Sequence, residues 1–287
     1  RKLAREFGID LNMVNGSGPK GRILKEDLHD YVKNALKDQS QNLKIPQQPE
    51  IDFSKWGATK IEKLSKFQKS SLKNLHSSWI TIPHVTQHDD ADITNLLKLR
   101  EKLFKKNKIK ISPLAYIVKC TAKTLKDFPE MNSSLSSKMD SLIYKDFYNI
   151  GIAVDTDAGL IVPNIKSADQ KSIVEISSEI NDLANLAKKR RLSNDHLSGA
   201  TFTISSLSGV GGKFFTPIIN PPEVGILGLS KTYDSVMIDK MKLHTKKQLP
   251  ISLSYDHRVI NGVYAVKFLT KLMQYLNDSK FLESSFK

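Results

Sequence analysis

The stretch LPISLSYDHRVINGVYAVKFL, Leu249 to Leu269, changes its hydrophobic period partway along. As far as Tyr255, apolar and polar residues alternate, which predicts a β-strand; later the apolar positions recur at helical spacing. The turn between them carries His257, flanked by an aspartate and an arginine and followed four residues later by Asn261. Because a histidine titrates near neutral pH and polar neighbours can fix its ring, His257 has the features of a positioned general base. A purely structural histidine is the alternative from the residues alone.

Length and composition indicate a globular chain. Its 287 residues, with 39% hydrophobic content, suffice for one or two units with a real core. The single cysteine, Cys120, excludes an internal disulfide and a cysteine-rich metal site, and it is interpreted as a packing residue in a reducing cytoplasm. The chain starts at Arg1 and shows neither a signal peptide nor a membrane span. We therefore expect a soluble fragment or processed product without a membrane partner.

The formal net charge of +14 raises several kinds of partner: nucleic acid, acidic membranes, acidic proteins and anionic cofactors. The densest basic run, Lys188 to Arg191, is interpreted as closing a predicted helix, where cations meet the negative end of the helix dipole. Basic residues are otherwise spread along the chain, without interleaved aromatics or a helix-turn-helix pattern. We expect no nucleic-acid partner, and nonspecific DNA binding is the competing hypothesis.

Glycine and proline signals divide the chain into three parts. Residues 1–37 combine helical patterns with the turn NGSGPKGR, a unit too small to bury much surface and more typical of a docking module than of an enzyme. Residues 38–52 are polar and Gln-rich with two prolines, which predicts a linker. Residues 53–287 mix longer helices and strands without regular alternation, and predict one mixed α/β (α+β) domain rather than a doubly wound sheet.

Local signals place several elements of this domain. Ser112-Pro113 predicts a helix start, and Ser172-x-x-Glu175 is a capping box ahead of an amphipathic helix. Residues 147–165 predict two strands around the turn DTDAG, and residues 200–206 a further strand that ends in Ser205 and Ser206.

Ser205 together with His257 suggests a serine hydrolase, but the Gly-x-Ser-x-Gly elbow is missing. A hydroxyl at a strand end can instead donate a hydrogen bond to a developing oxyanion, which needs no activation. A serine that only pairs with backbone is the structural alternative. The glycines at 209, 211 and 212 do not complete a dinucleotide-binding fingerprint, because Phe214 occupies the position of the third glycine, so they are interpreted as a reversing turn.

His84 and His88 are the best candidates for a metal site, since three aspartates follow closely. Alternation in IPHVTQHDDADI predicts a strand, which puts both histidines on one face but too far apart for one ion without further ligands. We therefore predict no metal site.

Several motifs, taken in order, resemble one family. These are MNSSL (131–135), NIGIAVDTDAGLIVP (149–163), FTISSLS (202–208), PPEVGILGLSK (221–231) and SYDHRVINGVYAVKFL (254–269). They are similar to signatures of the dihydrolipoyl acyltransferases of 2-oxo acid dehydrogenase complexes. The N-terminal unit resembles that family's peripheral subunit-binding domain, so the resemblance covers nearly the whole chain.

The resemblance implies a chloramphenicol acetyltransferase-like catalytic domain, in trimers that join into a larger hollow core of about 24 subunits. It implies active sites between trimer subunits, in a channel that coenzyme A enters from one side and a lipoyl arm from the other. Carried over residue by residue, His257 is the general base, Ser205 the oxyanion donor and Asn261 a supporting hydrogen-bonding residue. The other implied channel residues are Asn132, Asp155, Thr156, Gly159, Leu160 and Ser206.

The resemblance also implies partners. A lipoyl group would come from a domain absent from this chain, because the Asp-Lys-Met at 239–241 lies inside the catalytic region and is not a credible attachment site. Arg1, Arg5 and Arg22 fall where the family docks acidic faces of the pyruvate decarboxylase component and dihydrolipoyl dehydrogenase, contacts that salt should weaken.

The run from Val259 to Val263 is more similar to acetyl-transferring members than to succinyl-transferring ones. We therefore expect acetyl transfer within a pyruvate dehydrogenase complex. The alternatives are a succinyl or branched-chain acyltransferase and a noncatalytic assembly subunit, which would be expected to lose His257. The last ten residues, DSKFLESSFK, are more polar than the apolar tail that the family uses between trimers.

Overall fold

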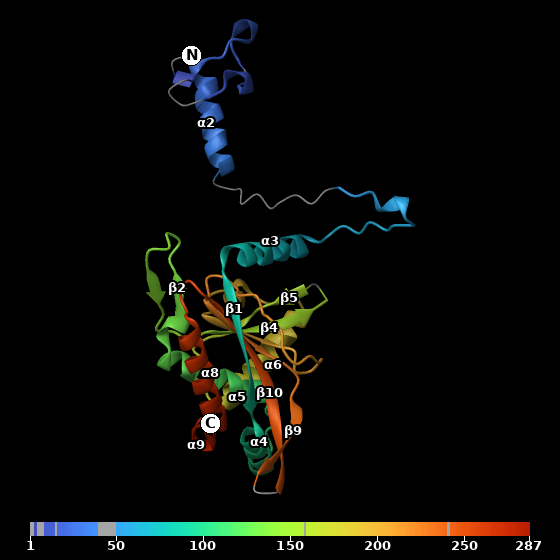
Figure 1. Cartoon of the computed structure of the whole chain (residues 1–287), viewed down its shortest axis with the longest axis vertical. Helices are drawn as coiled ribbons and strands as arrows, with labels where there is room; N and C mark the ends of the chain where they lie inside the picture. Colours follow the sequence, from blue (N-terminus) through green and yellow to red (C-terminus); the bar gives the residue numbers. More distant parts are fainter. Residues whose placement is uncertain (1–2, 5–8, 15, 40–49, 158, 240–241) are drawn as a thin grey trace. The chain divides into compact units, whose positions relative to one another are not determined.

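The computed structural model describes residues 3–4, 9–14, 16–39, 50–157, 159–239 and 242–287. The chain forms two compact units, Arg1–Glu62 and Lys63–Lys287, and each is described by itself (Figure 1). No helix in these described ranges is long and apolar enough to cross a bilayer.

The first unit is small and helical. Its elements are η1 (Leu11–Met13), η2 (Pro19–Gly21), α2 (Lys25–Gln39) and η3 (Phe53–Lys55). Ala4, Val14 and Leu28 form its buried core. Asp27 of α2 fixes the preceding glycine-rich turn, because its Oδ2 accepts the backbone N–H of Ser17 at 3.0 Å. The predicted order of turn and helix is confirmed in this part.

The second unit is built on one eight-stranded mixed sheet. The main path is β1-β10-β8-β7-β4-β5, with β9 paired to β10 and β6 to β4; β4, β7 and β8 are parallel and the other pairs antiparallel. Its strands are β1 (His84–Asp92), β4 (Ile150–Thr156), β5 (Gly159–Ile161), β6 (Asn164–Ile165), β7 (Phe202–Ser206), β8 (Gly225–Leu229), β9 (Tyr233–Asp239) and β10 (Lys242–Asp256). A separate ribbon pairs β2 (Ser133–Leu135) with β3 (Leu142–Tyr144).

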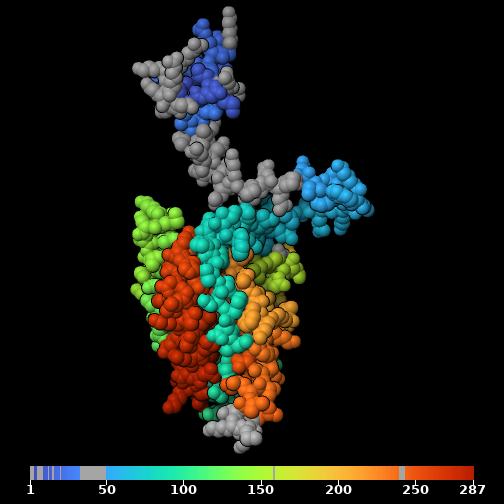
Figure 2. Space-filling model, in the orientation of Figure 1, coloured from blue at the N-terminus to red at the C-terminus, as the bar shows by residue number. Residues whose placement is uncertain are grey.

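Helices cover one face of the large sheet. The helices of this unit are α3 (Lys66–Thr81), α4 (Thr94–Asn107), α5 (Pro113–Asp127), η4 (Pro129–Asn132), α6 (Ile173–Lys188), α7 (Asn194–Leu197), α8 (Gly262–Asn277) and α9 (Ser279–Ser284). Side chains of α4, α5, α6 and α8 share one core with the apolar side chains of the strands, such as Ile204 and Leu253. Phe202 lies against Phe268 of α8, with ring centroids 5.8 Å apart. In Figure 2, β1 lies between α8 and β10 on the surface of this unit.

The opposite face carries small and polar side chains. One row across it consists of residues in register on β4, β7, β8, β10 and β1, namely Ala153, Ser205, Gly228, Ser252 and His88. Helix α3 crosses this face and contacts it near both ends. A Cβ on Gly159 would lie 2.9 Å from the Phe67 ring, and Trp79 stacks on His84 with centroids 5.6 Å apart. The helix therefore bridges the sheet and leaves space beneath its middle.

The local predictions for this unit are confirmed at most elements. β4 and β5 pair across the DTDAG turn, β7 ends at Ser206, and α5 starts at Pro113. In the α6 capping box, Glu175 Oε2 accepts the Ser172 N–H at 2.7 Å. The basic run closes α6 as predicted: Lys188 is the last helical residue and Lys189 is the C-cap.

Candidate active site

β10 delivers His257 into a turn whose backbone is held by neighbouring segments. The His257 N–H donates to the Pro83 carbonyl at 3.1 Å, and the preceding Asp256 N–H donates to that of Val224 at 2.9 Å. The Ile260 N–H closes the turn on the Asp256 carbonyl at 2.9 Å. The His257 side chain is exposed. The strand therefore presents an accessible imidazole on a fixed backbone.

The two charged neighbours of His257 pair with each other. Arg258 Nη2 lies 2.6 Å from Asp256 Oδ2, and Arg258 Nε lies 2.9 Å from Asp256 Oδ1. The hydrogen bonds that Arg258 donates to the Asp256 carboxylate raise the pKa of Arg258. Because Asp256 is only 2% exposed, this bidentate pairing offsets the cost of burying its carboxylate. The pair thus stabilises the turn on both sides of His257.

Asn261 is the N-cap of α8. Its Oδ1 accepts the backbone N–H of Tyr264 at 2.9 Å, which satisfies a donor that the first turn of a helix leaves free. The Tyr264 hydroxyl in turn accepts the Glu130 N–H at 3.2 Å. Asn261 therefore fixes the start of the helix four residues after His257.

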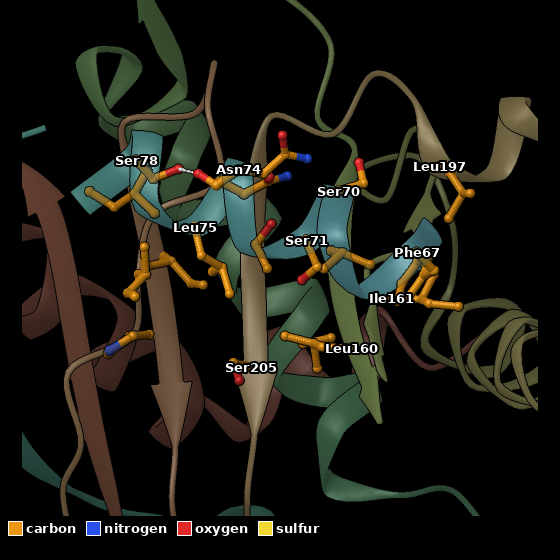
Figure 3. Close-up of a pocket in the computed structure, with 18 of the residues that line it drawn as sticks. Phe67, Ser70, Ser71, Asn74, Leu75, Ser78, Leu160, Ile161, Leu197 and Ser205 are labelled. Carbon is orange, nitrogen blue, oxygen red and sulfur yellow. Dashed lines mark hydrogen bonds between the residues drawn. The ribbon is translucent and has the colours of Figure 1, made fainter. Parts of the chain in front are cut away.

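Ser205 lies near the end of β7, in the wall of a cavity of about 470 Å³. The other walls come from α3, from β4 and β5, and from residues 215–220. Figure 3 shows α3 spanning the cavity, with Ser205 and Leu160 across from Leu75 and Ser71. Apolar side chains dominate the lining, and hydroxyl groups from α3 and β7 supply a few polar atoms. Such a site suits a thin, largely aliphatic ligand with a few polar groups.

Ser205 and His257 are far apart within one chain. Ser205 is in register with Gly228, and Gly228 with Ser252. His257 lies five residues beyond Ser252, which at about 3.3 Å per residue is roughly 16 Å along the strand, with two strand spacings across the sheet in addition. One chain therefore does not bring the two groups to one reacting atom.

The other predicted channel residues have different surroundings. Among the described residues, the lining of the Ser205 cavity includes Leu160 but not the other five. Asn132 is 1% exposed, and its amide donates to the carbonyls of Lys145 and Phe147. The remaining four lie on the β4–β5 hairpin or at the end of β7: Asp155, Thr156, Gly159 and Ser206. Their role in a channel stays a prediction.

The histidines of β1 are occupied by hydrogen bonds. His84 Nδ1 contacts the Ile82 carbonyl at 2.8 Å, and its Nε2 accepts the Ile219 N–H at 3.0 Å. Within the described ranges, no group of three or more His, Cys, Asp or Glu side chains is arranged to hold a metal ion. Cys120 is fully buried, and burial raises the pKa of its thiol, as expected for a packing residue.

Two features near the cavity were not predicted from the sequence. Helix α3 begins with a capping box at Ser65 and Gln68, a signal that could have located it, but its position over Ser205 depends on long-range packing. Glu223 is 3% exposed, and burial raises the pKa of Glu223 to about 7. The nearby Thr203 and Asn220 side chains and the charge of Lys145 act in the opposite direction.

The predicted docking residues lie in the first unit. Arg22 is exposed, and its carbonyl accepts the Gly18 N–H at 2.9 Å. Arg1 and Arg5 lie outside the described residues. The docking role of all three stays a prediction.

Comparison with solved structures defines the class of the second unit. It has the fold of an acyltransferase core: the chain matches a structure of dihydrolipoamide acetyltransferase from Azotobacter vinelandii with a TM-score of 0.79 and 41% identity over 83% of this chain and 100% of that one. A structure described as the cubic core of the pyruvate dehydrogenase multienzyme complex matches with a TM-score of 0.79 and 42% identity, over the same shares. The expectation of a mixed α/β acyltransferase fold is confirmed.

A model of the 2-oxoacid dehydrogenases acyltransferase (catalytic domain) matches residues 57–283, and an e3 binding domain matches residues 1–29. The chain belongs to the 2-oxoacid dehydrogenase acyltransferase family. Two relatives named dihydrolipoyllysine-residue acetyltransferase component of pyruvate dehydrogenase complex are 45% identical (Cupriavidus necator, 97% of this chain) and 44% identical (Pseudomonas aeruginosa, 98%). The chain covers 53% of each, and so spans about half of their length.

Proposed function

We propose that the chain transfers acetyl groups between a dihydrolipoyl arm and coenzyme A, as the core component of a pyruvate dehydrogenase complex. Two relatives that are named for this activity support the proposal, because their similarity extends over 97% and 98% of the chain. The retained His257 and Ser205 argue against a noncatalytic assembly subunit. Transfer of a succinyl or branched-chain acyl group is the second candidate.

One observation carries the assignment of roles. The description of the Azotobacter vinelandii enzyme names a serine, a histidine and an asparagine in its catalytic mechanism, with the histidine 52 residues after the serine and the asparagine four residues after the histidine. Ser205, His257 and Asn261 have the same separations. We assign His257 as general base, Ser205 as oxyanion donor and Asn261 as the residue that positions the turn.

The chemistry follows from these roles. His257 takes the proton of the coenzyme A thiol as its sulfur attacks the carbonyl carbon of the acetyl thioester on the lipoyl arm. The Ser205 hydroxyl donates a hydrogen bond to the oxyanion that forms. When the intermediate collapses, the lipoyl sulfur leaves and receives the proton from His257. A general base contributes about 10²- to 10⁴-fold to such a step, and one oxyanion donor about 10²- to 10³-fold.

The wide separation of Ser205 and His257 requires that each site combine two copies of the chain. His257 of one copy would enter the mouth of the cavity that holds Ser205 of the next. Exposed apolar side chains near both groups would be covered by this contact: Met139 and Val263 near the turn, Leu75 and Leu160 at the cavity. Because two different surfaces meet, a contact of this kind forms a closed ring when its rotation closes, and we propose the ring of three.

Both proposed substrates suit the cavity. A pantetheine arm and a lipoyl arm are each a thin aliphatic chain with amide groups, which matches an apolar lining with scattered hydroxyls and amides, such as those of Ser71 and Asn74. The channel roles of Asn132, Asp155, Thr156, Gly159, Leu160 and Ser206 belong to this proposal. The lipoyl group itself would be carried on a domain that is not among these 287 residues.

We further propose that residues 1–37 dock the decarboxylase and dihydrolipoyl dehydrogenase. Residues 38–52 would then be the linker between the two domains, and residues 53–287 the domain that catalyses acetyl transfer. The match to an e3 binding domain supports the first part. Arg1, Arg5 and Arg22 would supply the cationic surface, so docking should weaken as salt rises. Trimers would join into a larger core, for which the cubic core of the matched structure is the precedent.

Complementation tests the shared site. His257→Ala and Ser205→Ala chains are each assayed alone for acetyl transfer from acetyl coenzyme A to dihydrolipoamide, and then after co-assembly in equal amounts. In a random trimer, about a quarter of the interfaces pair an intact His257 with an intact Ser205, so about a quarter of the unaltered activity should return. A co-assembly of His257→Ala with the double variant is the matched control and should stay inactive. A mixture no more active than its two components would contradict a site shared between copies.

A further inference from the structure

The segment that leads into β8 contacts both parts of the site. Its Asn220 lines the cavity that holds the catalytic serine. Its Val224 carbonyl accepts, at 2.9 Å, the backbone N–H of the residue before His257. Between these two contacts, the Glu223 N–H donates to the Asn220 carbonyl at 3.1 Å. A change at Glu223 therefore reaches the wall of the cavity through its direct neighbours.

The carboxyl group of Glu223 is buried beside the floor of the cavity. Glu223 is 3% exposed, and its Oε1 accepts the Asn220 amide Nδ2 at 3.4 Å. Thr203, which lines the cavity, is close enough to lower the pKa of Glu223. Glu223 Oε2 and Thr203 Oγ1 are both buried, and neither has a hydrogen-bond partner among the described residues. Because unpaired buried polar atoms are costly, a proton on Oε2 that pairs the two is favoured.

Other titratable groups also lie near this segment. The charge of Lys145 lowers the pKa of Glu223. His84 Nε2 accepts the N–H of Ile219, the residue before Asn220, at 3.0 Å. The carboxylate of Asp256 is held by the guanidinium of its neighbour. Burial nevertheless raises the pKa of Glu223 to about 7, so this acid changes its charge close to neutral pH.

We propose that Glu223 is a positioning residue: as the neutral acid it joins Asn220 to Thr203 and holds this wall of the cavity, and as the carboxylate it lets the wall open. The inference rests on the proposed function, in which the cavity binds the substrate arms. In the neutral form, Oε1 accepts from the Asn220 amide and the Oε2 proton is donated to Thr203 Oγ1. A buried carboxylate is drawn toward water, and Asn220, which is exposed, moves with it.

The proposal predicts how KM depends on pH. With a pKa of about 7, the neutral fraction of Glu223 falls from about nine tenths at pH 6 to about one tenth at pH 8. Apparent affinity falls with the fraction of molecules that are competent to bind, so KM should rise roughly tenfold over this range. The value of kcat should follow His257 instead, because the saturated enzyme has its wall in place.

Glu223→Gln tests this dependence in the full 287-residue chain, with KM measured for acetyl coenzyme A and for dihydrolipoamide from pH 6 to pH 8. The amide accepts from Asn220 and donates to Thr203 but cannot ionise, so KM should change by less than about twofold. Glu179→Gln, on α6 in the helical layer, is the matched control and should keep the rise. The histidines titrate in all three chains, so their effects cancel in the comparison.

Lys145→Gln is a second test, which holds even where Glu223→Gln does not fold. Lys145 Nζ donates to the Ser133 carbonyl at 3.1 Å, and an amide can keep a hydrogen-bond donor there without the charge. Because the positive charge lowers the pKa of Glu223, its loss should raise that pKa and move the rise in KM to higher pH. A general loosening of the cavity would raise KM equally at every pH and would not move the midpoint.

The outcomes separate the inference from the function on which it rests. If the unaltered chain transfers acetyl groups but its KM is flat from pH 6 to pH 8, or rises equally in Glu223→Gln, then Glu223 does not position the wall and the proposed function stands. If the unaltered chain transfers no acetyl group at any of these pH values, the proposed function fails and the inference with it. A midpoint that stays fixed in Lys145→Gln would assign the rise in KM to a group other than Glu223.

Discussion

The two faces of the large sheet use the same strands for different purposes. On β7, Phe202 and Ile204 are buried in the helical core, while Thr203 and Ser205 line the cavity. Successive side chains of a strand point to opposite sides, so structural and functional positions alternate residue by residue. The helix face is packed with large apolar side chains, whereas the row through Ser205 on the cavity face consists of small or polar ones. Stability and activity should therefore be separable at adjacent positions.

The largest expected effect is on the helix face. Ile204 is 0% exposed within the main core, so Ile204→Ala should lower the free energy of unfolding by about 2–5 kcal/mol through lost burial and the cavity left behind. Urea denaturation measures the loss. Acetyl transfer by the fraction that remains folded should change little. If the free energy of unfolding fell by less than about 1 kcal/mol, this face would tolerate the lost volume.

The adjacent residue should behave in the opposite way. Ser205→Ala should lower kcat by about 10²- to 10³-fold with little change in KM, because in the proposed mechanism the hydroxyl acts only on the developing oxyanion. Its unfolding midpoint should match that of the unaltered chain, since Ser205 is only partly buried at the edge of a cavity. Steady-state kinetics beside urea denaturation gives both readouts. Near-unaltered turnover would remove Ser205 from the mechanism.

Local sequence signals predicted much of this arrangement. The turn at His257 follows from a change of hydrophobic period, and the capping box at Ser172 and Glu175 from residues three apart. Both depend on residues that are neighbours along the chain, so a single sequence contains the information. The strand predicted at residues 200–206 likewise follows from a local pattern.

What could not be predicted depends on register between distant segments. That Ser205 and His257 lie far apart follows only from the pairing of β7, β8 and β10, which no local pattern encodes. The Phe215 ring lies against Gly228, and the spacing of these two residues along the chain does not predict that contact. Buried Glu223 was missed for a related reason: the motif PPEVGILG shows a carboxylate but not the packing that encloses it.

Glu223 is an exception to the division between the faces, because it is an ionisable group buried beside Thr203 of the cavity face. Its pKa is raised from 4.5 to about 7, so the folded state disfavours the carboxylate. The stability it contributes is complete below pH 4.5 and is lost as pH rises through 7, by an amount on the order of 3 kcal/mol. Urea denaturation at pH 5 and pH 8 should show this loss.

Glu223→Gln isolates the contribution of this one carboxyl. The amide keeps a hydrogen-bonding group in place but cannot ionise, so the variant should lose less stability between pH 5 and pH 8 than the unaltered chain. Other groups titrate equally in both chains and cancel in the comparison. An identical pH dependence in the two chains would mean that Glu223 is ionised in the folded state at pH 5.

The smallest expected effect concerns Asn261, where stability and activity meet. Asn261→Ala removes the α8 cap and should cost about 1 kcal/mol, whereas Asn261→Asp should cost almost nothing because aspartate caps equally well. Ser172→Ala removes the α6 cap at a similar cost and is the matched control, since α6 does not carry the His257 turn. If Asn261 positions that turn, kcat should fall in Asn261→Ala, recover in Asn261→Asp and stay unchanged in Ser172→Ala. Equal kcat in the two alanine variants, measured beside thermal unfolding, would limit Asn261 to capping and leave the orientation of His257 to the Asp256–Arg258 pair.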